Sequence, residues 1–292
     1  MKVGIPIGDL SPTVALAVAV EADRLGYDSL WLPEHLAMPV GAGGSPFADS
    51  GPPVAGHGTA HPAIPPDTPF PDQFVFLASL AARTTRIRLA THVFNIGLRH
   101  PFTTARAVAT LDIVSGGRLD FGVGASWQAE EWRAVGLEFA SRGRRVDEAI
   151  AVCQRLWSER VVEHHGECFD FGPVMFEPKP VQRPWPPVHI GGDGPAALRR
   201  AATVGDGWVP MNHRLEELAG PIAHIARLRE AAGRSGRTEV TFWGPVRSPA
   251  DFGRYAEAGV DRVLARPWRR DEGPVEGVRR FAHELLGVRS PG

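Results

Sequence analysis

The chain has few cysteines and no long apolar run, and both absences limit what the protein can be. Only Cys153 and Cys168 are cysteines, which excludes a disulfide framework and a cysteine-based metal site. No apolar stretch approaches the roughly 20 residues that a membrane-spanning helix needs. Met1 leads directly into a strand-like segment rather than into a secretory signal. We therefore expect a cytoplasmic protein without a metal, whose two thiols are unreactive.

The chain also lacks an excess of charge of either sign. It carries 32 basic and 33 acidic residues, a formal net charge of -1, so no electrostatic attraction to nucleic acid or to a membrane surface is expected. A small-molecule substrate is the partner that this balance favours. With 43% hydrophobic residues among 292, residues 1–292 can bury a core as one domain.

Eight short apolar runs recur along the chain, and each is followed by a helical pattern. They are Val3 to Ile7, Ser29 to Leu32, Ile87 to Val93, Leu119 to Val123, Val188 to Ile190, Gly207 to Pro210, Val240 to Trp243 and Arg262 to Ala265. This alternation predicts an α/β fold, a (β/α)8 TIM barrel. In such barrels the loops after the strands build the active site, so candidate residues are sought at the carboxyl ends of the strands.

Local signals mark the first helix and two insertions. Ser11 suits a helix N-cap, Pro12 the first helical position and Gly26 the end of that helix. The 35 residues from 38 to 72 hold nine prolines and six glycines, which predicts a long loop after strand two. We interpret it as a lid, and a surface excursion without a role is the alternative. The pattern over residues 161–171 predicts a hairpin before strand five, with its turn at His165 and Gly166.

Polar residues follow strands two and three. Glu34 and His35 come directly after the second strand; histidine beside a carboxylate can serve as an acid or base near neutral pH, and a loop pair bonded to its surroundings is the alternative. Thr91 and His92 close the third strand, where His92 either contacts a ligand or bonds to neighbouring backbone. For Arg99, phosphate capture, a salt bridge and plain exposure remain open.

Two turns of small residues follow the fourth and fifth strands, Gly124-Ala125-Ser126-Trp127 and Gly191-Gly192-Asp193. Small residues let a ligand approach the main chain, and the N–H groups at a helix start attract anions. The alternative is tight packing between strand and helix. Neither spacing matches a dinucleotide fingerprint or a P-loop, but two such turns favour a phosphorylated cofactor.

The order of several motifs resembles the luciferase-like monooxygenase superfamily, particularly its deazaflavin-dependent oxidoreductases. These motifs are Leu30 to His35, Pro66 to Asp72, Thr84 to Leu89, Ala109 to Leu119, Arg142 to Ile150, Pro178 to Gln182, and Gly191-Gly192 through Gly205 to Trp208. The resemblance covers nearly the whole chain. It implies a barrel that binds coenzyme F420, or FMN in other branches, and in the F420 branch a hydride transfer to or from a small organic substrate. It further implies a homodimer, and a flavin or F420 reductase as a possible partner.

The resemblance also assigns roles to individual residues. His35, oriented by Glu34, exchanges a proton with the substrate, and His92 is a second candidate for this role. Thr91, His92 and Val93 support the ring, and the His92–Val93 peptide bond is expected to be cis. The turn residues bind the cofactor: Gly124, Ala125, Ser126 and Trp127 along the ring, and Gly191, Gly192 and Asp193 on the phosphate side, unless Asp193 caps the next helix.

Two positions depart from the family pattern. His92 stands where relatives usually carry a small residue, and Trp127 stands where several sugar-phosphate enzymes have a catalytic glutamate. A sugar-phosphate substrate is therefore not expected. The alternatives are an FMN-dependent monooxygenase and a non-catalytic flavin-binding homologue.

Overall fold

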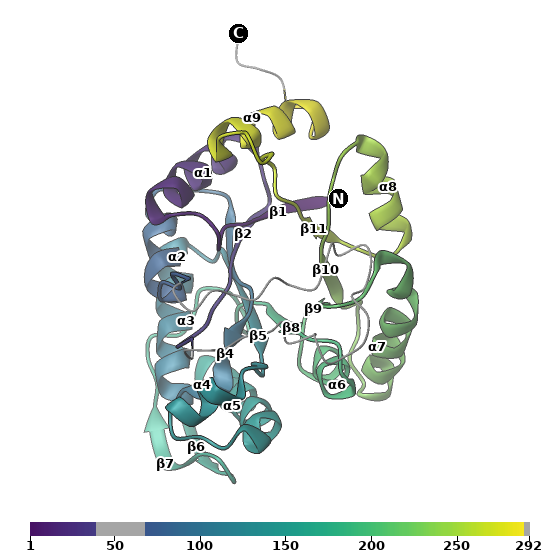
Figure 1. Ribbon diagram of the computed structural model, residues 1–292. Helices are drawn as coiled ribbons and strands as arrows, with labels where there is room; N and C mark the ends of the chain where they lie inside the picture. Colours follow the sequence, from purple (N-terminus) through teal and green to yellow (C-terminus); the bar gives the residue numbers. More distant parts are fainter. Residues whose placement is uncertain (39–67, 289–292) are drawn as a thin grey trace.

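The computed structural model describes residues 1–38 and 68–288. Within these residues a parallel sheet closes into a ring that helices surround (Figure 1). Its strands are β1 (Lys2–Pro6), β2 (Ser29–Leu32), β3 (Arg88–Thr91), β4 (Phe94–Asn95), β5 (Leu119–Gly124), β8 (Val188–Gly191), β9 (Gly207–Val209), β10 (Glu239–Trp243) and β11 (Arg262–Leu264). β4 continues β3 after a two-residue break, so the ring has eight strand positions and the predicted (β/α)8 barrel is confirmed.

The ring is continuous on both sides of its first strand. β1 pairs in parallel with β11 and with β2, and β3 pairs with β5 through Leu89 opposite Leu119. After the break, Phe94 of β4 lies opposite Val123 of β5. All pairings within this sheet are parallel, so every strand directs its carboxyl end to the same rim.

Helices pack around the ring (Figure 1). They are α1 (Pro12–Leu25), α2 (Gln73–Ala81), α3 (Pro101–Ser115), α4 (Ala129–Ala134), α5 (Arg142–Ser158), α6 (Pro195–Thr203), α7 (Ala219–Ala231), α8 (Pro249–Glu257) and α9 (Pro274–Leu285). The expected caps of α1 are confirmed: the Ser11 side chain accepts from the Val14 N–H, Pro12 opens the helix, and Gly26 ends it with a φ of 82°. No helix in the described segments is long and apolar enough to cross a membrane.

The predicted hairpin is also confirmed. β6 (Val161–His165) and β7 (Asp170–Met175) pair antiparallel and lie outside the ring, next to α5 (Figure 1). The turn between them is longer than expected, since Gly166 to Phe169 connect the strands and the Gly166 N–H donates to the Phe169 carbonyl. Most of the proposed lid, residues 39–67, lies outside the described residues.

Charged side chains fill the amino-terminal end of the barrel interior. Buried Asp120 accepts from Arg88 at 2.6 Å and lies 3.2 Å from Arg262. Arg262 also contacts Asp28 at 2.6 Å and Glu239 at 2.8 Å. Burial raises the pKa of Asp120, but nearby His189 and the two arginines outweigh it, so the pKa lies far below its ordinary value.

A layer around Trp31 lies above these charges. Trp31 packs with Ala90, Val209 and Leu264 in a separate buried cluster. The interior is therefore filled from its amino-terminal end to the middle, and ligands are expected to enter from the carboxyl-terminal rim.

Candidate active site

Glu34 joins the end of β2 to the segment after β3. Its carboxylate accepts from the Asn95 N–H at 2.7 Å and from the Arg99 guanidinium at 2.5 Å. Burial raises the pKa of the Glu34 carboxyl, and Arg99 and the Asn95 amide oppose that rise. Of the alternatives for Arg99, the structure shows the salt bridge. The interpretation of Glu34 as the residue that orients His35 is wrong, because among the described residues its carboxylate bonds Asn95 and Arg99 and forms no hydrogen bond or ion pair with the imidazole.

The carboxylate that faces His35 belongs to Glu131 of α4. The distance from His35 Nδ1 to Glu131 Oε2 is 3.6 Å, and the side chains are 7% and 0% exposed. The His35 ring lies edge-on to Phe70 and Trp127, with ring centroids 5.1 and 5.5 Å away. Among the described residues, His35 Nδ1 has no hydrogen-bond partner. The rim thus holds a nearly buried imidazole between two aromatic rings and a carboxylate.

Glu131 is held by several donors. Its Oε1 accepts from the backbone N–H groups of Leu36 at 2.5 Å and Ala37 at 3.2 Å, and its Oε2 accepts from the Ser126 hydroxyl at 3.0 Å. Burial raises the pKa of Glu131, but His35 and these N–H donors lower it more, so the pKa lies below its ordinary value. Glu131 is therefore a buried, ionised carboxylate beside His35.

The segment after β3 bears out one specific expectation, since the His92–Val93 peptide bond is cis. The Thr91 hydroxyl donates to the Gly122 carbonyl at 2.6 Å. The His92 ring lies edge-on to Trp31, with centroids 5.8 Å apart, and 5.7 Å from the ring of Trp243. His92 therefore lies at the top of the filled barrel interior, between two tryptophans.

Two of the predicted cofactor glycines pack against a side chain. A Cβ atom on Gly124 would lie 2.6 Å from Val93 Cγ2, and one on Gly191 would lie 2.9 Å from Val93 Cγ1. Both glycines make room for Val93, which agrees with the packing alternative at these positions. Gly192 has a φ of 118°, a conformation that favours glycine.

The turn after β5 uses its own polar groups. Ser126 has a φ of 55°, and its hydroxyl accepts from the Gln128 N–H at 3.1 Å while donating to Glu131. This removes one of the donors that an anion would need there. Ala125 is half-buried beside it, and Trp127 forms a wall next to His35.

Asp193 does not cap the helix that follows it. Its carboxylate accepts from the N–H groups of Met211 at 2.9 Å and Asn212 at 3.0 Å, and it lies 3.7 Å from His213. The residue preceding α6 is Gly194, which makes no side-chain capping bond. The capping alternative is therefore wrong. At the start of α6, Pro195 has no N–H, and the N–H groups of Ala197 and Leu198 donate to the Gly194 carbonyl at 2.9 and 3.1 Å.

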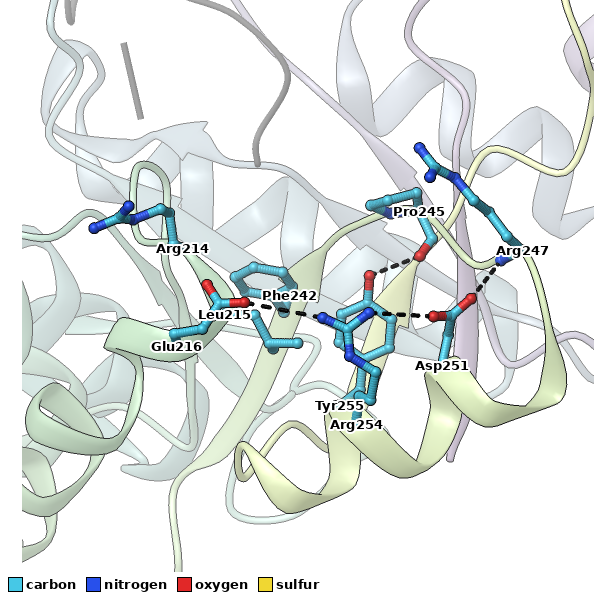
Figure 2. A pocket seen from close by; sticks show the side chains of 9 residues that line it. All are labelled: Arg214, Leu215, Glu216, Phe242, Pro245, Arg247, Asp251, Arg254 and Tyr255. Atoms are coloured by element: carbon cyan, nitrogen blue, oxygen red, sulfur yellow. Dashed lines mark hydrogen bonds and ion pairs between the residues drawn. The ribbon is translucent and has the colours of Figure 1, made fainter. Parts of the chain in front are cut away.

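A separate cavity of about 260 Å3 lies between the loop after β9 and helix α8 (Figure 2). Its lining residues are Arg214, Leu215, Glu216, Phe242, Pro245, Arg247, Asp251, Arg254 and Tyr255. Arg254 lies 3.5 Å from Asp251 and 3.9 Å from Glu216, and Arg214 contacts Glu217 at 2.6 Å. None of the predicted site residues lines this cavity, and the rim around His35 remains the candidate site.

Sequence reasoning missed Glu131. Glu130 and Glu131 are adjacent in the first turn of α4. Such a pair is typical of a charged, solvent-exposed helix start. Glu130 follows that pattern, since it is 53% exposed and bonds Arg133 at 3.0 Å. The two carboxylates differ in environment only because residues 35–37 pack onto α4 at Glu131. No pattern in the sequence predicts that packing.

A closed barrel with a nearly buried histidine and two buried glutamates at its carboxyl-terminal rim is typical of a barrel enzyme whose site is built from loops. The model of the luciferase-like monooxygenase family matches residues 6–250, and the chain belongs to this family.

Relatives are similar over most of their length. An uncharacterized protein of Mycobacterium tuberculosis is 34% identical over 228 residues, which are 78% of this chain and 75% of the relative. The F420-dependent glucose-6-phosphate dehydrogenase of Kineococcus radiotolerans is 30% identical over 295 residues, covering 88% and 79% of the two chains. The solved structure of an F420-dependent secondary alcohol dehydrogenase has a TM-score of 0.77 at 17% identity over 99% of each chain, and this likeness shows the fold.

Proposed function

We propose that this protein is an F420-dependent oxidoreductase that transfers a hydride between the deazaflavin ring and a small organic substrate. The observation that carries the proposal is the nearly buried imidazole of His35 on the rim of a luciferase-like barrel. The relative from Kineococcus radiotolerans, which is named as F420-dependent, supports the choice of cofactor.

The described residues fit such a cofactor at two places. Thr91, His92 and Val93 form the predicted ring support, and their conformation is fixed by the Thr91 bond and by packing of Val93 on two glycines. The start of α6 is the proposed phosphate side, because a helix N-terminus attracts anions and no side chain caps this one. The Asp193 carboxylate beside it is occupied by two backbone donors. When bound, the deazaflavin supplies two-electron hydride chemistry.

The chain's own residues handle the proton. We assign His35 to take the hydroxyl proton when an alcohol is oxidised and to return it when a carbonyl is reduced. Phe70 and Trp127 flank the imidazole and keep water from it. His92 is the second candidate for proton exchange or substrate contact. Its ring lies between those of Trp31 and Trp243.

The rim favours a neutral substrate over a sugar phosphate. The cation at this rim, Arg99, already forms a salt bridge with Glu34 at 2.5 Å. By the resemblance to the family, Trp127 stands where several sugar-phosphate enzymes carry a glutamate. Since Glu131 is buried beside the imidazole, an anionic substrate would be repelled.

The test measures turnover of F420 with a panel of small alcohols, ketones and sugar phosphates. Turnover is monitored as the loss or recovery of the visible absorption of F420. We expect a neutral substrate to react, and His35→Asn to lower turnover roughly 100-fold or more while the affinity for F420 stays within about two-fold. An unchanged rate in the variant would remove His35 from the mechanism. Oxygen-dependent product formation with FMN would instead identify an FMN-dependent monooxygenase, supplied with reduced flavin by a reductase.

We also propose that the protein forms a homodimer. Val75 on α2 is 73% exposed and Val114 on the neighbouring α3 is 52% exposed, which places apolar surface on adjacent helices. Light scattering should give twice the chain mass of 31.5 kDa. A mass of one chain would refute the dimer.

A further inference from the structure

Two adjacent glutamates at the start of α4 have opposite environments. Glu130 is 53% exposed and pairs with Arg133, whereas the Glu131 side chain is 0% exposed. Burying an ionised carboxylate is costly unless donors surround it. The bonds to Leu36, Ala37 and Ser126 meet that requirement, so this charge is built into the rim.

The charge of Glu131 acts on one particular atom of His35. Oε2 lies 3.6 Å from Nδ1, and Nδ1 is a buried atom without a hydrogen bond to any described residue. A neutral imidazole carries its proton on one nitrogen and a lone pair on the other. A lone pair at Nδ1 would face the carboxylate and be repelled, whereas an N–H there would be attracted. At 3.6 Å the two atoms lie beyond hydrogen-bond distance, so the carboxylate acts on the imidazole through its charge.

We propose that Glu131 is the positioning residue of His35: it holds the imidazole in the tautomer protonated at Nδ1, which leaves Nε2 as the nitrogen that exchanges a proton with the substrate. Glu131 acts through His35 and does not touch the substrate. The catalytic half of this assignment rests on the proposed function, and the structural half, the tautomer, does not.

The other carboxylate at this rim does not take that role, because among the described residues Glu34 forms no hydrogen bond or ion pair with His35. Its oxygens accept from the Asn95 N–H and from Arg99. Glu131 differs because its Oε2 lies 3.6 Å from His35 Nδ1 and also accepts from the Ser126 hydroxyl. Ser126 in turn is held by the Gln128 N–H, which fixes the direction of the carboxylate.

The direct test is nitrogen NMR of the protein without cofactor, labelled with 15N at histidine. The His35 signals are identified by their loss in His35→Asn, and the spectra are recorded at alkaline pH, where imidazoles are neutral. We expect His35 to be the Nδ1-protonated tautomer in the unaltered chain. In Glu131→Gln the tautomer should become mixed or reversed, while the matched control Glu130→Gln keeps the original spectrum. A His35 protonated at Nε2 in the unaltered chain overturns the proposal without need of any variant, and so does an identical tautomer in Glu131→Gln.

Kinetics test the catalytic half separately. With a reactive substrate, Glu131→Gln should lower kcat roughly 10- to 100-fold, leave KM within about two-fold and leave F420 affinity unchanged, while Glu130→Gln stays at the original kcat. Equal activity of the two variants would overturn the catalytic role of Glu131. If the protein binds no F420 but His35 shows the expected tautomer, the proposed function fails and the positioning of His35 by Glu131 stands.

Discussion

The packing of Val93 between two glycines gives a prediction whose size follows from the structure. Gly124→Ala would place a Cβ atom 2.6 Å from Val93 Cγ2, about 1 Å closer than an ordinary contact, so the side chain of Val93 or the strand must move. Overpacking of this kind costs about 1 to 3 kcal/mol. Val93→Ala alone leaves a small gap and costs about 1 to 2 kcal/mol.

The double variant separates packing from cofactor contact. With alanine at both positions the two Cβ atoms lie about 3.7 Å apart, the distance from the added Cβ to Val93 Cβ, so the clash disappears. The double variant should then be more stable than the sum of the single effects predicts, by about 1 to 2 kcal/mol. Urea unfolding of the cofactor-free protein measures this coupling. Additive effects, or a neutral Gly124→Ala, would refute the reasoning. Gly253→Ala on α8 is the control, because its Cβ would meet open space and should not destabilise the protein.

Three further predictions concern the rest of the barrel. Arg24, with Arg279 of α9, lowers the pKa of Glu21 from its ordinary value of 4.5 to about 2, so this contact stabilises the fold fully above about pH 4.5 and is lost as the pH falls towards 2. Glu21→Gln should therefore flatten the dependence of Tm on pH in that range, and an unchanged slope would contradict this prediction. Asp120→Asn leaves buried Arg262 and half-buried Arg88 short of one charge and should cost about 3 to 5 kcal/mol in urea unfolding, whereas a loss below about 1 kcal/mol would show that the network is not coupled. Burial raises the pKa of the Cys153 thiol, so a disulfide reagent should modify Cys153 only after denaturant is added; rapid labelling of the native protein at Cys153 would contradict its burial.

The sequence was sufficient for features that are determined locally. Ser11, Pro12 and Gly26 mark both ends of α1 because each residue has a strong preference for its position in a helix terminus. The alternation of apolar runs and helical patterns predicted the barrel for a similar reason. The cis bond at His92 came from resemblance, since no local preference distinguishes that peptide from its neighbours.

The contacts of the rim could not be predicted in the same way. Glu34 and His35 adjoin in sequence, yet their side chains have different partners, because Arg99 takes the first and Glu131 of α4 faces the second. Asp193 was a plausible helix cap by its position, but the backbone donors of Met211 and Asn212 compete for its carboxylate. In each instance a residue distant in sequence determines the contact of the side chain, and spacing along the sequence does not predict that residue.

The central claim is that this barrel uses the deazaflavin, and a parallel fluorescence titration of the cofactor-free protein with F420 and with FMN tests it most directly. The account predicts saturable binding of F420 at least ten-fold tighter than that of FMN, with His35→Asn and Glu131→Gln binding F420 as the unaltered chain does. Tighter binding of FMN, or saturation by neither cofactor, would contradict it.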